Sequence, residues 1–166
     1  MTSIAQPTRT AAPRQVQTAY RLYVASAVLG LIAFVVSLFL LPAAVAAAEQ
    51  QLQGRTTNGV DVHSIAVGGA IAGAVIGGLV AIAYFVLTLV FAAKMRRGRN
   101  WARIVLLVFA ALHVLGLVGV ATGATPVLTA LLSVLVTVLS VIAAVLTFLP
   151  ESSAWFRSMK ETAQTV

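Results

Sequence analysis

Four long runs of apolar residues, separated by short polar stretches, dominate the chain. They cover about residues 20–42, 62–93, 101–121 and 126–149. Because an α-helix rises about 1.5 Å per residue, each run is long enough to cross a hydrocarbon core about 30 Å thick. The pattern therefore predicts an all-α fold, a bundle of four transmembrane helices. The second run is long enough to tilt or to project from the bilayer.

Basic residues fall almost entirely on one side of the predicted bundle. They precede the first run, form the turn between the second and third runs, and follow the fourth run: Arg9, Arg14, Arg21, Lys94, Arg96, Arg97, Arg99, Arg103, Arg157 and Lys160. The other side carries Arg55 alone. Lysine and arginine in short loops favour the cytoplasmic side. We therefore expect both termini in the cytoplasm, with residues 1–18 as a flexible tail and residues 150–166 as a short one.

The first run also has features of a secretory signal peptide. Arg21 lies at its start, and the small-residue tract Ala46-Ala47-Ala48-Glu49 follows it like a cleavage site. The apolar run is longer than the segment of about 7–15 residues that signal peptides use, and the polar stretch before it is long. We therefore favour a retained first helix.

The composition supports a membrane protein and argues against several soluble classes. Apolar residues make up 60% of the chain and charged residues 9%, where soluble domains carry about 25% charged residues. The net charge of +7 does not predict nucleic-acid binding, because the basic residues flank apolar runs and no nucleic-acid motif accompanies them. The chain has no cysteine, which excludes disulfides, thiol redox chemistry and thiolate metal sites.

The basic turn at residues 94–103 predicts contacts with lipid headgroups. Lysine and arginine near a membrane surface attract anionic lipids, and tryptophan is enriched at the same depth. We expect a contact surface at the inner leaflet made of Lys94, Arg96, Arg97, Arg99, Arg103, Trp101 and Trp155.

The second run carries a stripe of glycines, Gly69, Gly73 and Gly77, at every fourth position. This spacing lets two helix backbones approach closely in lipid. The pattern predicts a packing surface whose partner is either another helix of this chain or a second protein. We favour the internal partner.

The fourth run carries hydroxyl side chains near one face, at Thr129, Ser133, Ser140 and Thr147. Such hydroxyls bond back to their own helix or across to a neighbour. We expect Ser133 and Ser140 to serve helix packing, because a polar pore would need more strongly polar residues.

His113 is the ionisable residue expected deepest in the membrane, about 15 Å beyond Arg103 by helix rise. We expect a neutral imidazole hydrogen-bonded to a neighbouring helix, with the hydroxyls of the fourth run as first candidates. A proton relay, or a haem or quinone contact, is the functional alternative. His63 is expected at the outer interface, so a haem held by both histidines is not expected.

The sequence predicts no catalytic, cofactor or metal site. The acidic residues, Glu49, Asp61, Glu151 and Glu161, all lie in loops, tails or helix ends. Functional ionisable groups of membrane proteins usually lie within the spans. Neither a phosphate-binding loop nor a Ser/His/Asp set can be assembled. We therefore expect no enzyme activity, no cofactor and no metal.

Two segments carry a family resemblance. They are Arg97-Gly98-Arg99-Asn100-Trp101-Ala102-Arg103-Ile104 and Leu149-Pro150-Glu151-Ser152-Ser153-Ala154-Trp155-Phe156-Arg157. They are similar to the basic turn and the final tail of small four-span actinobacterial (mycobacterial-type) integral membrane proteins of mostly unknown function. The resemblance implies a multi-pass protein of the bacterial plasma membrane. Some such proteins are accessory subunits of larger assemblies, including respiratory supercomplexes.

The sequence thus predicts a non-enzymatic protein that acts by helix packing with other membrane components. The expected partners are the lipid bilayer, anionic lipids at the inner leaflet, and other membrane protein subunits or further copies of the chain. Nucleic acid is not among them. A small oligomeric transporter or channel is the alternative function, and an enzyme comes third.

Overall fold

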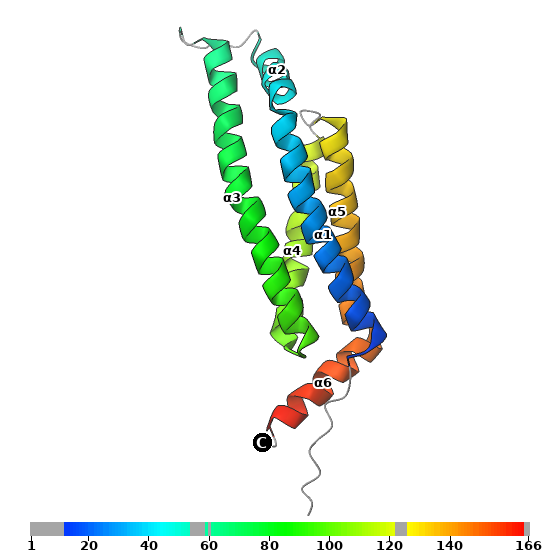
Figure 1. The fold of residues 1–166 in the computed structure, drawn as a ribbon. Coiled ribbons are helices and arrows are strands. Elements are labelled where there is room, and N and C mark those ends of the chain that lie inside the picture. Colours follow the sequence, from blue (N-terminus) through cyan, green and yellow to red (C-terminus); the bar gives the residue numbers. More distant parts are fainter. Residues whose placement is uncertain (1–11, 54–58, 60, 122–125, 165–166) are drawn as a thin grey trace, which may run out of the picture.

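The computed structural model describes residues 12–53, 59, 61–121 and 126–164, and all regular structure in them is helical. The helices are α1 (Arg14–Phe39), α2 (Leu41–Leu52), α3 (Val62–Arg96), α4 (Asn100–Ala121), α5 (Val127–Phe148) and α6 (Pro150–Gln164) (Figure 1). Four of them, α1, α3, α4 and α5, are long and apolar enough to cross a membrane. The expected all-α bundle of four long apolar helices is confirmed.

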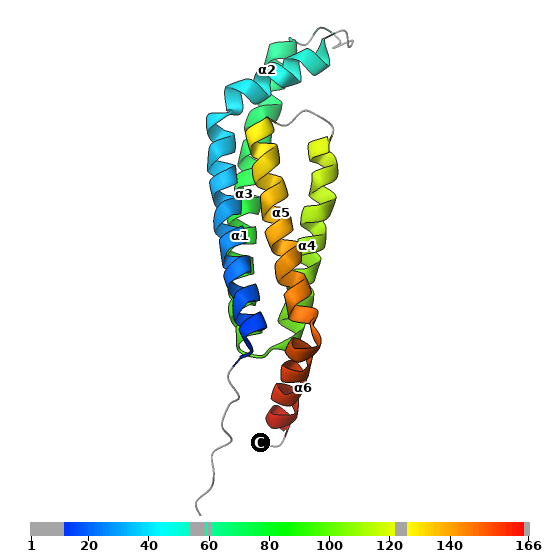
Figure 2. The ribbon, with the colours of Figure 1, turned by 90° about the vertical axis from the view of Figure 1, so that its right-hand side faces the viewer.

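The four long helices form a closed ring. Helix α1 packs against α3 and α5, and α4 packs against the same two helices from the other side. Figure 2 shows α6 below the bundle and α2 beyond its opposite end. We call these the basic end, which holds the turn between α3 and α4, and the α2 end.

Local sequence accounts for several helix ends. The Asp61 carboxylate caps α3 by accepting a hydrogen bond from the Ser64 backbone N–H at 3.0 Å. Gly98 adopts a positive φ of 84° in the turn between α3 and α4, a conformation that costs glycine nothing and other residues about 1 kcal/mol or more. Pro42 and Pro150 stand in the first turns of α2 and α6, where a missing N–H does no harm.

The tightest packing lies at the basic end. A cluster of buried side chains there joins α1, α3, α4, α5 and α6: Val16, Ala19, Tyr23, Ala92, Met95, Ala102, Leu106, Ala143, Trp155 and Phe156. Small alanines let the backbones approach closely, which is how helices pack without a hydrophobic driving force. Large apolar side chains elsewhere on the four long helices are exposed, as suits faces turned to lipid tails.

The glycine stripe does not find the internal partner that we favoured. A side chain added at Gly69 or Gly73 would meet nothing within 4 Å, and one at Gly77 would only touch Phe34 at 3.9 Å. The close approach occurs instead at Gly78, where an added Cβ would lie 2.8 Å from the Phe34 ring. The helix turns most of the stripe away from its neighbours within the chain, and the stripe as a packing surface stays a prediction.

The length of α3 leaves one of its ends little covered. Its 35 residues span about 52 Å, whereas the 22 residues of α5 span about 33 Å. Figure 1 shows α3 running past the end of α5, alongside α2. This is the end at which α3 begins, at Val62.

Both predicted tails differ in part from the structure. Residues 150–166 were expected as a short tail, but Pro150–Gln164 form helix α6. Helix α1 begins at Arg14, inside the segment 1–18 that was expected to be flexible, and residues 1–11 lie outside the described part. The first apolar run ends as a span at Phe39, and Leu41 begins a separate helix.

A pair of variants tests the assignment of the close contact. Gly78→Leu should lower the free energy of unfolding by about 1–3 kcal/mol, because its side chain must displace the Phe34 ring. Gly73→Leu should leave it unchanged or slightly raised, because the added side chain meets open space and leucine favours helix more than glycine does. Thermal unfolding of both purified variants, followed by circular dichroism in detergent, gives the comparison. Equal losses in melting temperature would place the contact elsewhere.

Candidate functional site

A cavity of about 680 Å³ lies among the four long helices, in the half of the bundle nearer to α2. Each long helix contributes to its wall. The lining residues are Gly30, Ala33, Phe34 and Ser37 of α1; Gly77, Val80, Ala81, Ala83, Tyr84 and Leu87 of α3; Phe109, Leu112, His113, Gly116 and Leu117 of α4; and Thr129, Ser133, Val136 and Thr137 of α5. The wall is mainly hydrocarbon, with a few polar residues contributed by all four helices.

The cavity opens sideways, between α3 and α4. The lining residues of α5 are buried or half-buried, whereas Val80 and Ala83 of α3 and Leu112 and Gly116 of α4 are exposed. Helices α3 and α4 meet at the basic turn and separate toward the α2 end in both views (Figures 1 and 2). The mouth is therefore flanked by exposed apolar and small side chains of two membrane-crossing helices.

The α5 hydroxyls in this wall bond to their own helix. The hydroxyl of Thr129 donates to the Pro126 carbonyl at 2.7 Å, that of Ser133 to the Thr129 carbonyl at 2.9 Å, and that of Thr137 to the Ser133 carbonyl at 2.8 Å. Ser133 thus contributes no cross-helix bond. Ser140, one turn closer to the basic end, is fully buried, which agrees with the packing role expected of it.

His113 lies deep in the bundle, as expected, but its partner is not another helix. Its Nδ1 lies 3.1 Å from the Phe109 carbonyl oxygen of the same helix. A carbonyl only accepts, so Nδ1 carries the proton, and in the neutral ring Nε2 is left as an acceptor. The expected hydroxyl from the fourth run does not reach it, because those hydroxyls donate to α5 carbonyls. Sequence cannot show this competition between local and cross-helix bonds.

Tyr84 is the polar residue of the wall that sequence reasoning missed. Its ring centroid lies 4.7 Å from that of His113 and 5.5 Å from that of Phe109. Its hydroxyl is buried and has no hydrogen-bond partner. The hydroxyls of Tyr23, Thr88 and Ser140 share that condition. Buried hydroxyls normally have a partner, so Tyr84 is an exception, and its buried hydroxyl is not accessible from the cavity.

At the basic end, six of the seven expected lipid-contact residues are exposed or half-buried. Arg97 and Arg99 are exposed in the turn, and Trp101 is 43% exposed. Lys94 lies 5.2 Å above the Trp101 ring, which joins a cation and an amphipathic ring at one surface. Arg96 is also exposed, but it lies 5.3 Å from the Tyr20 ring of α1. Contact of these residues with anionic lipid stays a prediction.

Arg103 and Trp155 occupy different surroundings from those expected. Trp155 is 8% exposed and stacks edge-on against Phe156, 4.9 Å away. The Arg103 guanidinium lies 5.0 Å from the Phe148 ring and 5.1 Å from the Phe156 ring, and donates to the Ser153 hydroxyl at 3.4 Å. Both residues therefore fasten α6 under the bundle. The sequence does carry a signal for α6 that we missed, because apolar and polar residues of 150–159 alternate with a helical period.

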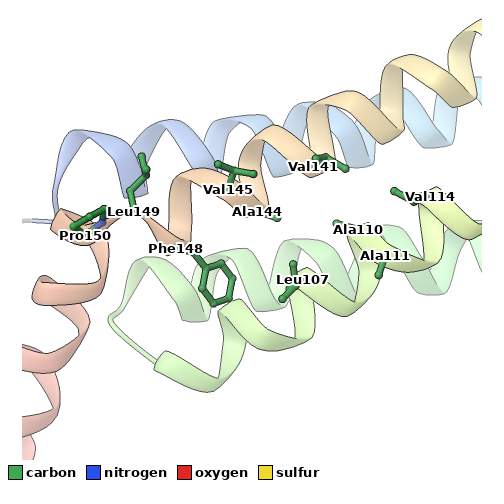
Figure 3. Close-up of a pocket in the computed structure, with 10 residues that line it drawn as sticks. All are labelled: Leu107, Ala110, Ala111, Val114, Val141, Ala144, Val145, Phe148, Leu149 and Pro150. Atoms are coloured by element: carbon green, nitrogen blue, oxygen red, sulfur yellow. The ribbon is translucent and has the colours of Figure 1, made fainter.

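A second hollow lies on the outside of the bundle, between α4 and α5 near the basic end. It measures about 520 Å³. Figure 3 shows side chains of both helices lining it, and all of them are hydrocarbon: Leu107, Ala110, Ala111, Val114, Val141, Ala144, Val145, Phe148, Leu149 and Pro150. A groove with this lining can seat a lipid tail but offers no group for chemistry.

The other histidine belongs to the α2 end. His63 Nδ1 lies 2.5 Å from the Glu49 carboxylate, which ties the start of α3 to α2. The His63 side chain is 69% exposed, in keeping with the surface position expected from the sequence. Among the described residues there is no group of three or more side chains that could hold a metal ion.

Comparison with known proteins adds nothing to this geometry. No protein-family model, no curated protein and no solved structure matches the chain. Function must therefore be argued from the bundle itself.

The contacts of Arg103 give a test of how α6 is held. Arg103→Gln removes the cation–π contact with Phe156 of α6, worth about 0.5–2 kcal/mol, and should raise the open population of α6 about two- to thirtyfold. Hydrogen–deuterium exchange in residues 150–159 should accelerate accordingly. Arg99→Gln, at an exposed position in the turn before α4, is the matched control and should leave exchange unchanged. Equal exchange in the two variants would show that Arg103 does not hold the helix.

Proposed function

We propose that this chain is a non-enzymatic, multi-pass protein of the bacterial plasma membrane that acts by packing against another membrane protein through α3. The observation that carries the proposal is that α3 is the longest span and the least covered. Only 6% of its most apolar 18-residue stretch is buried, against 33% for α5. A helix with this much free apolar surface suits an intermolecular contact.

The open glycines support a helix as the contacting element. Gly69 and Gly73 are one turn apart, and neither faces a neighbour within the chain. Ile76 and Leu79, which follow along α3, are 62% and 66% exposed. Two helices associate in lipid when small residues admit a close backbone approach and larger side chains interlock around it. The partner that fits is a transmembrane helix of another subunit.

An accessory role in a larger assembly follows from this contact and from the family resemblance of the basic turn. Such a subunit needs no catalytic group of its own. A respiratory supercomplex is one assembly of the kind that the resemblance suggests. The lipid bilayer, with anionic lipids around Lys94, Arg96, Arg97 and Arg99, is the other proposed partner.

The proposed orientation puts the basic end in the cytoplasm. The last turn of α3 and the connection to α4 hold Lys94, Arg96, Arg97 and Arg99, whereas Arg55 is the only basic residue of the chain between α1 and α3. Short loops rich in lysine and arginine remain on the cytoplasmic side during insertion. On this orientation α2 and the overhang of α3 lie on the outer face.

A small oligomeric transporter or channel is the alternative, and the central cavity is the observation that favours it. The hydroxyls of its α5 wall, however, donate to carbonyls of their own helix, so few donors are free to replace the water shell of a polar solute. No acidic residue lies among the residues lining the cavity. Solute flux into vesicles containing the pure protein would favour the alternative.

Gly73→Leu tests the proposed contact, because it adds bulk to the open face without disturbing the fold. In membranes extracted with a mild detergent, the wild-type chain should migrate in an assembly much larger than its own 17.2 kDa. Gly73→Leu should shift it to the free form, since leucine prevents close backbone approach. Ala25→Leu, the same kind of change at an exposed position of α1, is the matched control.

Two results would contradict this account. A wild-type chain that migrates alone would leave α3 without a partner, and a Gly73→Leu chain that remains assembled would move the contact elsewhere. If the pure protein forms the assembly by itself, the partner is a second copy of the chain.

Reporter fusions test the orientation. A reporter at the C-terminus should be active in the cytoplasm, and one inserted next to Gly59 should be active outside, because positive charge retains the basic end. A C-terminal reporter that is active only outside the cytoplasm would contradict the proposed orientation. Replacing Arg96, Arg97 and Arg99 together with glutamine should mix the two orientations.

A further inference from the structure

The central cavity has the size of a ligand site. Its volume of about 680 Å³ falls in the range of about 300–1,000 Å³ found for small-molecule pockets. A water molecule occupies about 30 Å³ in the liquid, so the cavity is far larger than the space that one buried water needs. An empty space of this size would deprive its wall of dispersion contacts. An apolar occupant would restore them.

The position of the mouth indicates where the occupant comes from. The exposed residues of the lining belong to α3 and α4, and the buried ones to α5. Val80 and Leu112 at the mouth are hydrocarbon side chains of helices that can cross a membrane. A molecule that enters between them comes from the bilayer and must itself dissolve in lipid.

The wall also limits the charge of the occupant. None of the lining residues is an aspartate, glutamate, lysine or arginine. A charged group in such surroundings would stay uncompensated, which is strongly unfavourable. A phosphate headgroup or a carboxylate therefore does not fit inside the cavity, and the group that enters it is neutral.

One polar group of the wall is left for the occupant. Nδ1 of His113 is engaged with the Phe109 carbonyl, which leaves Nε2 as an acceptor. The Tyr84 hydroxyl also has no partner, but it is buried among protein atoms and only its residue's remaining surface lines the cavity. The occupant must therefore donate a hydrogen bond to His113, and a hydroxyl does so. A ketone or an ester lacks the proton that His113 needs.

We propose that the cavity binds a neutral bilayer lipid with a long apolar body and one free hydroxyl, whose O–H donates to Nε2 of His113. The ligand class is thus a long-chain or isoprenoid alcohol. This site does not depend on the contact proposed for α3, because Gly69 and Gly73 lie outside the cavity lining.

The test uses the full-length protein in lipid nanodiscs and a photoreactive sixteen-carbon alcohol with a mid-chain diazirine. After irradiation, mass spectrometry locates the labelled residues. Saturable labelling should map to the cavity, in the stretch 109–117 of α4 and 77–87 of α3. The methyl ether and the phosphate ester of the same chain are the matched probes. The ether should label about tenfold less, the equivalent of one lost hydrogen bond, and the phosphate ester should not label the cavity.

Two variants distinguish the effect of the hydrogen bond to His113 from the effect of the space in the cavity. His113→Leu should reduce labelling by the alcohol to the level of the ether. It should not unfold the protein, because the Phe109 carbonyl keeps the backbone N–H of residue 113 as its helical partner. Gly116→Leu narrows the mouth without a clash and should reduce labelling by every probe. Leu115→Ala, at an exposed position outside the lining, should label like the wild type.

The result that overturns the proposal is equal labelling by the alcohol and its ether together with no effect of His113→Leu. Preferential labelling by the phosphate ester would overturn it as well. Labelling confined to residues outside the cavity would show that no lipid enters. Elution volume and helical circular dichroism confirm that each variant is folded before labelling is compared.

Discussion

Every backbone N–H and C=O within a lipid core needs a partner in the protein, because hydrocarbon offers none. This constraint makes each long apolar run of the chain a continuous helix. It also accounts for many of the hydroxyl side chains, although the buried hydroxyls of Tyr23, Tyr84, Thr88 and Ser140 have no partner. The hydroxyls of Ser26, Ser37, Thr129, Ser133, Thr137 and Thr147 all donate to a carbonyl three or four residues earlier in their own helix. A polar side chain that is satisfied locally is free to face lipid, a cavity or another helix.

Because the backbone hydrogen bonds form within each helix, packing between the helices depends on the shapes of their side chains. By this measure the bundle divides into two halves. At the basic end, alanines and the side chains of α6 fill the space between the helices. Toward the α2 end, α3 and α4 separate and leave the cavity beside Tyr84 and His113. Among the glycines that the structure describes, Gly78 is where α1 approaches α3 too closely for a side chain, because the Phe34 ring lies against it. The tightly packed basic end thus holds the helices together. The α2 end, where the helices separate, carries the surfaces that are available to a partner or a ligand.

Hydropathy alone was enough to predict the four long helices, because length and apolar composition decide whether a segment can span a bilayer. Helix α6 escaped that test because it is short and amphipathic, so its aromatic residues looked like interface anchors. The glycine stripe shows a different limit. A period of four identifies a packing face but not the direction in which it points, since this depends on how α3 is rotated against α1 and α4. Tyr84 was missed for the same reason, because an aromatic residue in an apolar run has no pattern that reveals an unpartnered hydroxyl.

The central claim is that α3 crosses the bilayer with its free face in contact with lipid or with a partner helix. The chain has no cysteine, so single cysteines can be introduced at exposed positions and spin-labelled without background. In nanodiscs that contain the pure protein, labels at Leu79, Ile82 and Val86 should collide with oxygen, which concentrates in the lipid core. A label at Gln53 should collide with a water-soluble nickel complex instead. Labels on α3 that are accessible to the nickel complex and shielded from oxygen would contradict the account, because α3 would then lie in water.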